Sequence, residues 1–102
     1  MEINQAVISG VVIDVESQRI SPGGIAHQRF TLQHRSRQEQ AGQPREVFCR
    51  ILVEMRGDLV AQVQPIAVND RLKVEGFWDR SSYKDDTASK LILHAQQLQK
   101  LL

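Results

Sequence analysis

Hydrophobic and polar residues alternate along much of the chain with the period of two that is typical of β-strands. The clearest alternation covers residues 46–55, whose two faces differ in character. The face expected to line the core consists of Val47, Cys49, Ile51 and Val53. The opposite face, expected to be at least half exposed, consists of Phe48, Arg50, Leu52 and Glu54.

Four further segments have the composition of strands, and they cover residues 6–16, 27–34, 71–78 and 90–98. Gly10 and Gly76 lie inside the first and fourth strands of the chain. A glycine in the middle of a strand is typical of a bulge or a sharp bend. The positions expected to face the core are Phe30, Leu32, Leu72, Val74, Trp78, Leu91, Leu93 and Ala95.

The segments between these strands contain turn-forming and polar residues. The run Ser-Pro-Gly-Gly at 21–24 predicts a tight turn. Residues 36–45 have no apolar periodicity, so we expect a polar loop there, and a second one at 79–89. Apolar residues recur every three or four positions between 57 and 66, which predicts one short helix that Pro65 ends.

Five strands with a short helix between the third and the fourth predict a small closed barrel. An open sheet of this length would leave one apolar face uncovered, whereas a barrel buries that face and removes the free edges. This order of elements is that of the five-stranded oligonucleotide-binding (OB) fold, an all-β barrel. Residues 1–102 are expected to form one such domain.

Composition limits where and how the chain works. A chain of 102 residues has room for one modest core but not for separate cofactor and substrate domains. No apolar run approaches the roughly 20 residues of a membrane-spanning helix, and the start has no signal-peptide pattern, so we expect a cytoplasmic protein. The single cysteine, Cys49, excludes a disulfide within the chain.

Charge is unevenly distributed, although the net charge is only +1. Between residues 19 and 50 two acidic residues, Glu39 and Glu46, accompany six basic ones: Arg19, Arg29, Arg35, Arg37, Arg45 and Arg50. Phe48 lies among these arginines on the exposed face of its strand. An aromatic ring for stacking bases and guanidinium groups for phosphates are what a single-stranded nucleic acid requires. The alternative is an ordinary two-sided strand whose Phe48 covers a neighbouring side chain.

The sequence shows no catalytic or metal-binding pattern. His27, His34 and His94 are far apart and lack partners at metal-ligand spacing, so we expect strand residues and no metal or other cofactor. Motifs for nucleotide hydrolysis and acyl transfer are absent from the sequence, so we do not expect an enzyme. Tyr83 and Lys84 in the last polar loop, and Lys90 at the start of the strand after it, could contact nucleic acid, whereas Asp85-Asp86 would repel it.

Short motifs distributed over nearly the whole chain resemble those of a known family. They are Gly10 through Val12, Ile20-Ser-Pro-x-Gly-Ile25, Phe30-x-Leu-x-His-Arg-Ser36, Gln38-Glu39, Ala41-Gly42, Gly76-Phe77 and Ser89-Lys90-x-x-Leu-His-Ala95. The sequence resembles the primosomal replication protein N family, which is similar to the bacterial single-stranded-DNA-binding proteins. This resemblance implies a non-enzymatic homodimer of OB folds that binds single-stranded DNA at stalled replication forks. It also implies contacts with the primosomal helicase and with a helicase-loading partner.

Carried over by position, the family's DNA-binding surface falls on Arg19, Ser21, Arg35, Phe48, Lys84 and Lys90, to which the strand pattern adds Arg50. The main aromatic platform, usually Trp in the family, is Phe48 here. A second family aromatic corresponds to Gln43, and the lysine-rich loop of the family contains Asp85 and Asp86. These departures favour weaker DNA binding. They leave open a primosome adaptor with vestigial DNA binding, and an RNA-binding barrel as a third interpretation.

Overall fold

The alternating segments form six strands and one short helix in the computed structural model of the chain, whose described residues are 1–81 and 90–101. The strands and helix are β1 (Ala6–Val15), β2 (Arg19–Ile20), β3 (Ala26–Gln40), β4 (Gln43–Arg56), α1 (Asp58–Gln62), β5 (Arg71–Arg80) and β6 (Leu91–Leu101). All five predicted strands are present. The additional element, β2, is a two-residue strand immediately before the predicted turn at 21–24, and it pairs with the start of β3.

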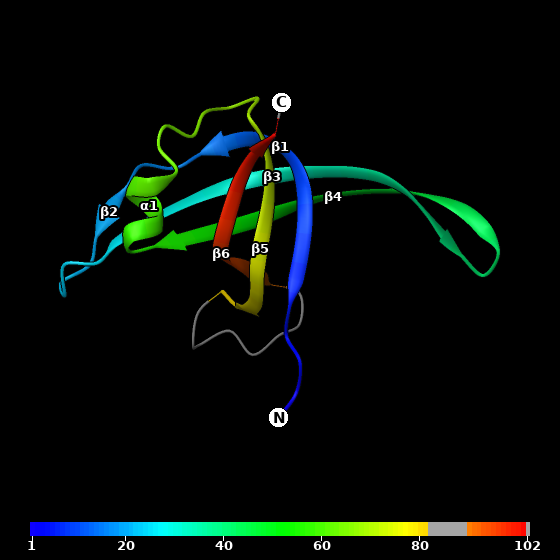
Figure 1. Cartoon of the computed structure of the whole chain (residues 1–102), viewed down its shortest axis with the longest axis horizontal. Helices are drawn as coiled ribbons and strands as arrows, with labels where there is room; N and C mark the ends of the chain where they lie inside the picture. The colour runs from blue at the N-terminus through cyan, green and yellow to red at the C-terminus, as the bar shows by residue number, and fades with distance from the viewer. Residues whose placement is uncertain (82–89, 102) are drawn as a thin grey trace.

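Five of these strands close into a barrel (Figure 1). They follow one another in the order β1-β5-β6-β4-β3, and β1 also pairs with β3, which completes the ring. Neighbouring strands are antiparallel except β4 and β6, which run parallel where Val53 pairs with Leu93. With α1 between β4 and β5, the predicted OB barrel is confirmed.

The two strand glycines lie where backbones approach one another closely. A Cβ at Gly10 would overlap the carbonyl oxygen of Gln33 on β3, and a Cβ at Gly76 would overlap the carbonyl oxygen of His94 on β6. The register between β5 and β6 also shifts beside Gly76, as a bulge requires. β1 exchanges partners near Val11, which pairs with both β5 and β3, so this strand serves two neighbours in the barrel.

The barrel interior is filled by the predicted apolar face of each strand. Val12, Phe30, Leu32, Val53 and Val74 are completely buried. Earlier in β4, towards its start at Gln43, Val47 and Cys49 are only partly buried. Trp78 is partly buried and packs against the core, as predicted.

The inward assignment of Leu91 is wrong. Leu91 is 50% exposed, whereas the next residue, Ile92, is 2% exposed. Leu91 is the first residue of β6 and pairs with Arg80 at the last position of the β5–β6 ladder. Its side chain therefore lies at the end of the barrel and not above the core. Leu93, two residues on, is buried in the core as predicted.

Residues 36–45 form a β-ribbon and not the predicted polar loop. β3 and β4 remain paired without interruption from His27↔Arg56 to Gln40↔Gln43, so the hairpin extends beyond the barrel (Figure 1). Ala41 and Gly42 form its turn, with φ angles of 54° and 74°. The prediction failed because it relied on apolar alternation, and a ribbon with two exposed faces needs none.

The predicted helix at 57–66 is shorter than expected. α1 covers only Asp58–Gln62 and begins after Gly57, whose φ is 68°. Val60 is buried against the barrel, and Ile66 also joins the core from the extended segment that follows. Among the described residues, no helix is long and apolar enough to cross a membrane.

Candidate nucleic-acid interface

An aromatic ring and two guanidinium groups meet on the outer face of β3 and β4. Phe48 is 51% exposed and pairs across the ladder with Arg35. The guanidinium carbon of Arg35 lies 5.0 Å from the Phe48 ring centroid, and that of Arg50 lies 5.9 Å from it. Both distances are in the range of cation–π contacts. The structure thus brings together three residues that were predicted to bind nucleic acid.

This arrangement combines the two chemistries that a single strand needs. The exposed part of the Phe48 ring offers a surface for stacking a base, and guanidinium planes stack on bases as well. Arg50 Nε donates to Gln33 Oε1 at 3.3 Å, which holds this side chain along the strands. The remaining guanidinium nitrogens can donate to phosphate oxygens.

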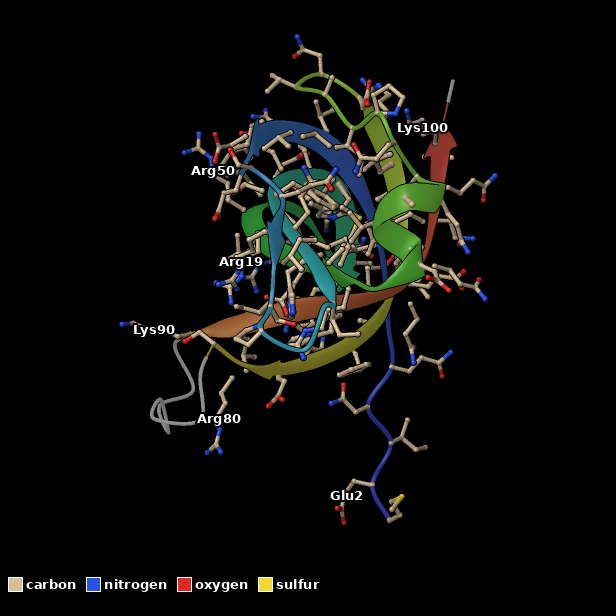
Figure 2. All side chains as sticks on the ribbon, turned by 90° about the vertical axis from the view of Figure 1, so that its left-hand side faces the viewer. Glu2, Arg19, Arg50, Arg80, Lys90 and Lys100 are labelled. Carbon is tan, nitrogen blue, oxygen red and sulfur yellow. The ribbon has the colours of Figure 1, made fainter. Side chains whose placement is uncertain are left out.

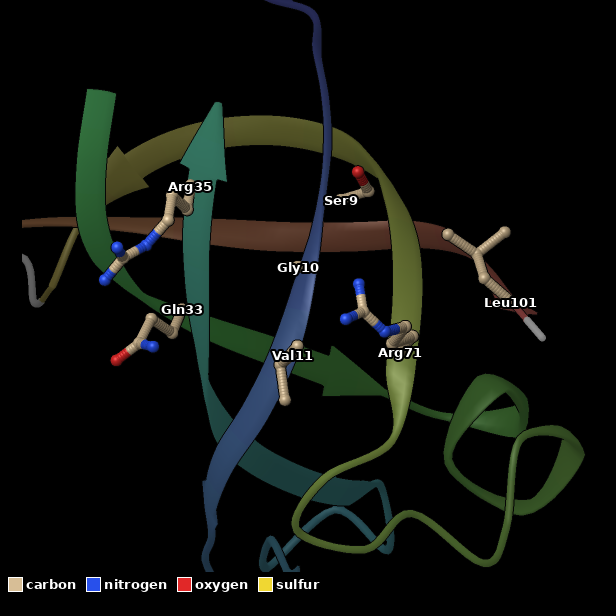
Figure 3. A pocket seen from close by; sticks show the side chains of 7 residues that line it. All are labelled: Ser9, Gly10, Val11, Gln33, Arg35, Arg71 and Leu101. Carbon is tan, nitrogen blue, oxygen red and sulfur yellow. The ribbon is translucent and has the colours of Figure 1, made fainter. Parts of the chain in front are cut away.

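A hollow of about 360 Å³ adjoins Arg35 where β1 leaves β3. Its lining residues are Ser9, Gly10, Val11, Gln33, Arg35, Arg71 and Leu101. Figure 3 shows Arg35 and Arg71 on either side of β1. Arg71 is not among the residues predicted from the sequence, because only closure of the barrel brings the start of β5 close to the middle of β3.

Two arginines of the predicted basic stretch lie on the ribbon and are already paired. Arg37 Nε donates to Glu46 Oε1 at 2.7 Å, and Arg45 donates to Gln40 Oε1 at 2.5 Å. These contacts use part of the hydrogen-bonding capacity of both guanidinium groups within the ribbon itself.

The remaining predicted positions differ in their surroundings. Arg19 is exposed on β2, whereas Ser21 Oγ accepts a hydrogen bond from the Ile25 backbone N–H at 3.2 Å and shapes the turn. Lys90 is exposed just before β6, and its carbonyl accepts from the Ser81 N–H at 3.0 Å. Lys84, Tyr83, Asp85 and Asp86 lie outside the described residues. Figure 2 shows Arg19, Arg50, Arg80 and Lys90 along one side of the molecule.

The predicted exposure of Glu54 is wrong. It lies on the outer face of β4, as its parity requires, but its side chain is only 1% exposed. Arg29 and Arg56 cover it, and their Nε atoms donate to its two carboxylate oxygens at 2.8 and 2.5 Å. Burial would raise the pKa of Glu54, but the hydrogen bonds and charges of these arginines outweigh it and lower that pKa below its usual range. Arg29 on β3 pairs directly across from Glu54 on β4. The strand register that brings these two residues together could not be predicted from the sequence.

Two of the three histidines contact other groups of the protein. His34 Nδ1 donates to the carbonyl oxygen of Ser9 at 2.7 Å, and its Nε2 lies 2.7 Å from Ser36 Oγ. His94 stacks on Phe77 with ring centroids 5.3 Å apart. In the described part of the chain, no three His, Cys, Asp or Glu side chains are grouped as metal ligands would be.

Comparison with known families agrees with this geometry. Residues 4–97 match a family described as "another single-strand binding protein family". The match covers most of the chain, and the chain therefore belongs to this family of single-strand binding proteins. The family resemblance predicted from the sequence is confirmed.

Curated relatives are similar over almost their whole length. A protein of Photorhabdus laumondii named replication restart protein PriB is 39% identical over 100 residues, which cover 97% of this chain and 94% of the relative. The protein of the same name from Yersinia pseudotuberculosis serotype O:1b is 37% identical, with the same coverage.

Solved structures share the fold. The protein priB from Ralstonia solanacearum superposes with a TM-score of 0.83 at 21% identity, covering 98% of this chain and 100% of that one. The single-stranded DNA binding protein from Thermus aquaticus superposes with a TM-score of 0.78 at 22% identity, covering 98% of this chain and 50% of that one.

Proposed function

We propose that this protein binds single-stranded DNA as a non-enzymatic accessory factor of replication restart. The observation that supports this function most directly is the half-exposed Phe48 ring with Arg35 and Arg50 beside it on the outer face of an OB barrel. Curated relatives that share more than a third of their residues with this chain are named replication restart proteins. This role would place the protein in the cytoplasm, where the bacterial chromosome is replicated.

The proposed mechanism is sequence-tolerant capture of exposed template strand. A base stacks on Phe48, which is worth about 1–3 kcal/mol. Arg35 and Arg50 bind the flanking phosphates, and Arg71 lies close enough to the same hollow to contribute. Because phosphate contacts release counterions, the affinity falls as the salt concentration rises. Arg19, Lys84 and Lys90 are proposed as further contacts at the loops beside this face.

We also propose that the protein works as a homodimer that bridges the primosomal helicase to its loading machinery. The free edge of β1 supports the first part: Ala6–Val11 pairs with β5, but in the described structure β1 pairs with β3 only from Val11 onward. The backbone before Val11 therefore has an open side where a second copy of β1 can pair. Sedimentation equilibrium tests the dimer, and a pull-down with purified helicase tests the bridge.

The DNA-binding proposal is tested by fluorescence titration of a labelled oligothymidylate at two salt concentrations. We expect Phe48→Ala and Arg35→Ala each to weaken binding at least tenfold, because they remove the stacking surface and a phosphate contact. Val68→Ala is the matched control for Phe48, since Val68 is also 51% exposed but lies in the loop before β5. Unchanged affinity in both interface variants would show that DNA does not use this face, and the adaptor interpretation would then lead.

A further inference from the structure

A second cationic cluster lies on the same outer face as Phe48, near the His27↔Arg56 end of the β3–β4 ladder. Its centre is the buried Glu54 carboxylate, which Arg29 and Arg56 contact directly. Arg19 reaches it from β2, with a nitrogen 3.9 Å from Oε1, and His94 Nδ1 lies 3.6 Å from Oε2. One carboxylate therefore faces three guanidinium groups, and these four side chains together leave a local excess of two positive charges.

The arginines of this cluster remain accessible. The side chains of Arg19 and Arg56 are 65% and 58% exposed, whereas Glu54 is buried beneath them. Each contacts the carboxylate through a few atoms only, so other guanidinium nitrogens are available to an anion from solution. Across the ladder from both arginines lies His27, whose Nδ1 is buried without a hydrogen-bond partner in the described structure.

A continuous path joins this cluster to Phe48. Phe48 and Glu54 are six residues apart on β4, which corresponds to about 20 Å at 3.3 Å per residue. The outward residues between these two ends contain no carboxylate: they are Thr31, Gln33, Arg50 and Leu52. A polyanion lying along β3 and β4 thus meets cations at both ends and no acidic side chain of these strands between them, although the exposed Asp14 of β1 pairs with Thr31 beside this path.

We propose that Arg19, Arg29 and Arg56 form a second binding site for phosphates of the single strand, in which Glu54 is the positioning residue. This inference rests on the proposed function. Glu54 limits the rotamers of the arginines, so that less side-chain entropy is lost when a phosphate binds. The cluster and Phe48 would together bind a longer strand than either does alone.

The test compares a short oligothymidylate of about 4 nucleotides with a long one of about 16, the range of sites covered by one OB fold. For Arg19→Ala/Arg56→Ala we expect about tenfold weaker binding of the long oligonucleotide. For this oligonucleotide, the slope of log K against log salt concentration should decrease in magnitude by about 1.4, because each of the two lost phosphate contacts contributes about 0.7 to the slope. Binding of the short one, held at Phe48, should change less than about twofold.

Glu54→Gln distinguishes the positioning of the arginines by Glu54 from the effect of its negative charge. This substitution removes one negative charge, so simple attraction would tighten binding, whereas loss of positioning weakens binding of the long oligonucleotide. Lys73→Ala/Lys100→Ala is the charge-matched control, and Figure 2 shows Lys100 on the side of the molecule opposite Arg19. If the Arg19→Ala/Arg56→Ala double variant fails to fold, Arg19→Ala alone replaces it in the test. Arg19 is largely exposed, and its nitrogen lies 3.9 Å from Glu54 Oε1, which is too far for a hydrogen bond.

Three results would overturn the second phosphate site by itself. The first is that Arg19→Ala/Arg56→Ala binds the long oligonucleotide as tightly as the wild type does, while Phe48→Ala binds it more weakly. This result would leave the proposed function intact. The second is an equal loss in the Lys73/Lys100 control, which would indicate general electrostatics. The third is equally effective competition by poly-glutamate, which would indicate an acidic protein partner. Absence of DNA binding by the wild type would overturn both the site and the proposed function.

Discussion

Phe48 and Glu54 lie on the same face of β4, and yet one is half exposed and the other is buried. The difference arises from their neighbours. Phe48 is bordered by Arg35 and Arg50, which leave about half of its surface in contact with solvent. Glu54 is enclosed by side chains from β2, β3, β4 and β6, each of which is a donor or a potential donor to its carboxylate. Strand parity predicts the face of a residue, but burial on that face depends on the strands beside it.

The paired Glu54 carboxylate should make stability depend on pH. Its pKa is lowered in the folded protein, so its contribution is complete above the usual Glu pKa of about 4.3 and is lost as the pH falls through the folded value. We expect Glu54→Gln to reduce the free energy of unfolding by about 1–3 kcal/mol at pH 7, from the loss of charged hydrogen bonds. The difference in unfolding free energy between Glu54→Gln and the wild type, measured by urea denaturation, should become smaller as the pH falls towards 3.

Glu46→Gln is the control for this measurement. Glu46 pairs with Arg37 on the ribbon, where both side chains are largely exposed, and such a pair contributes about 0–1 kcal/mol. A gap between Glu54→Gln and the wild type that stays constant from pH 7 to pH 3 would contradict the assignment of the effect to the Glu54 carboxylate.

At the scale of elements, the β3–β4 hairpin has two parts that are stabilised differently. Near Phe30 and Val53 its inner face is buried in the barrel, so hydrophobic burial stabilises the pairing. In the ribbon beyond Phe48, most residues are exposed on both faces. There the backbone ladder, the Arg37–Glu46 pair and the turn geometry maintain the hairpin.

The turn of the ribbon is therefore a place where stability can be raised without touching the interface. Ala41 has a φ of 54°, a conformation that costs an ordinary L-residue about 1–2 kcal/mol and that Asn adopts more readily. We expect Ala41→Asn to stabilise the ribbon by up to about 1 kcal/mol. Hydrogen exchange of the ribbon amides should then slow by up to about fivefold. Gln40→Asn, one position outside the turn, is the control, and equal effects from both changes would refute the argument.

At the scale of the whole molecule, closure of the barrel depends on two close backbone approaches. β1 passes the Gln33 carbonyl at Gly10, and β5 passes the His94 carbonyl at Gly76. Neither neighbour is a flexible side chain that could move aside. Glycine is thus required at these positions by the packing of strands and not by a left-handed backbone.

Gly10→Ala and Gly76→Ala should consequently destabilise the protein by about 1–3 kcal/mol or more, because the added methyl group forces the strands apart. The unfolding midpoint in urea measures this loss. Gly23→Ala is the matched control, since a Cβ at Gly23 has no neighbouring atom within 4 Å. The interpretation would be wrong if all three variants unfolded at the same urea concentration.

The residue pattern was sufficient to predict the five strands, core residues such as Phe30, Leu32 and Val53, and the exposed Phe48 among its arginines. These features follow from local alternation, which a strand of period two imposes on each segment separately. The tertiary structure was needed to show that residues 36–45 pair as a ribbon, that Glu54 is buried under Arg29 and Arg56, and that Arg71 lines the same hollow as Arg35. Each of these depends on which strands pair and in what register, and pairing between distant segments is not encoded in the pattern of any one of them.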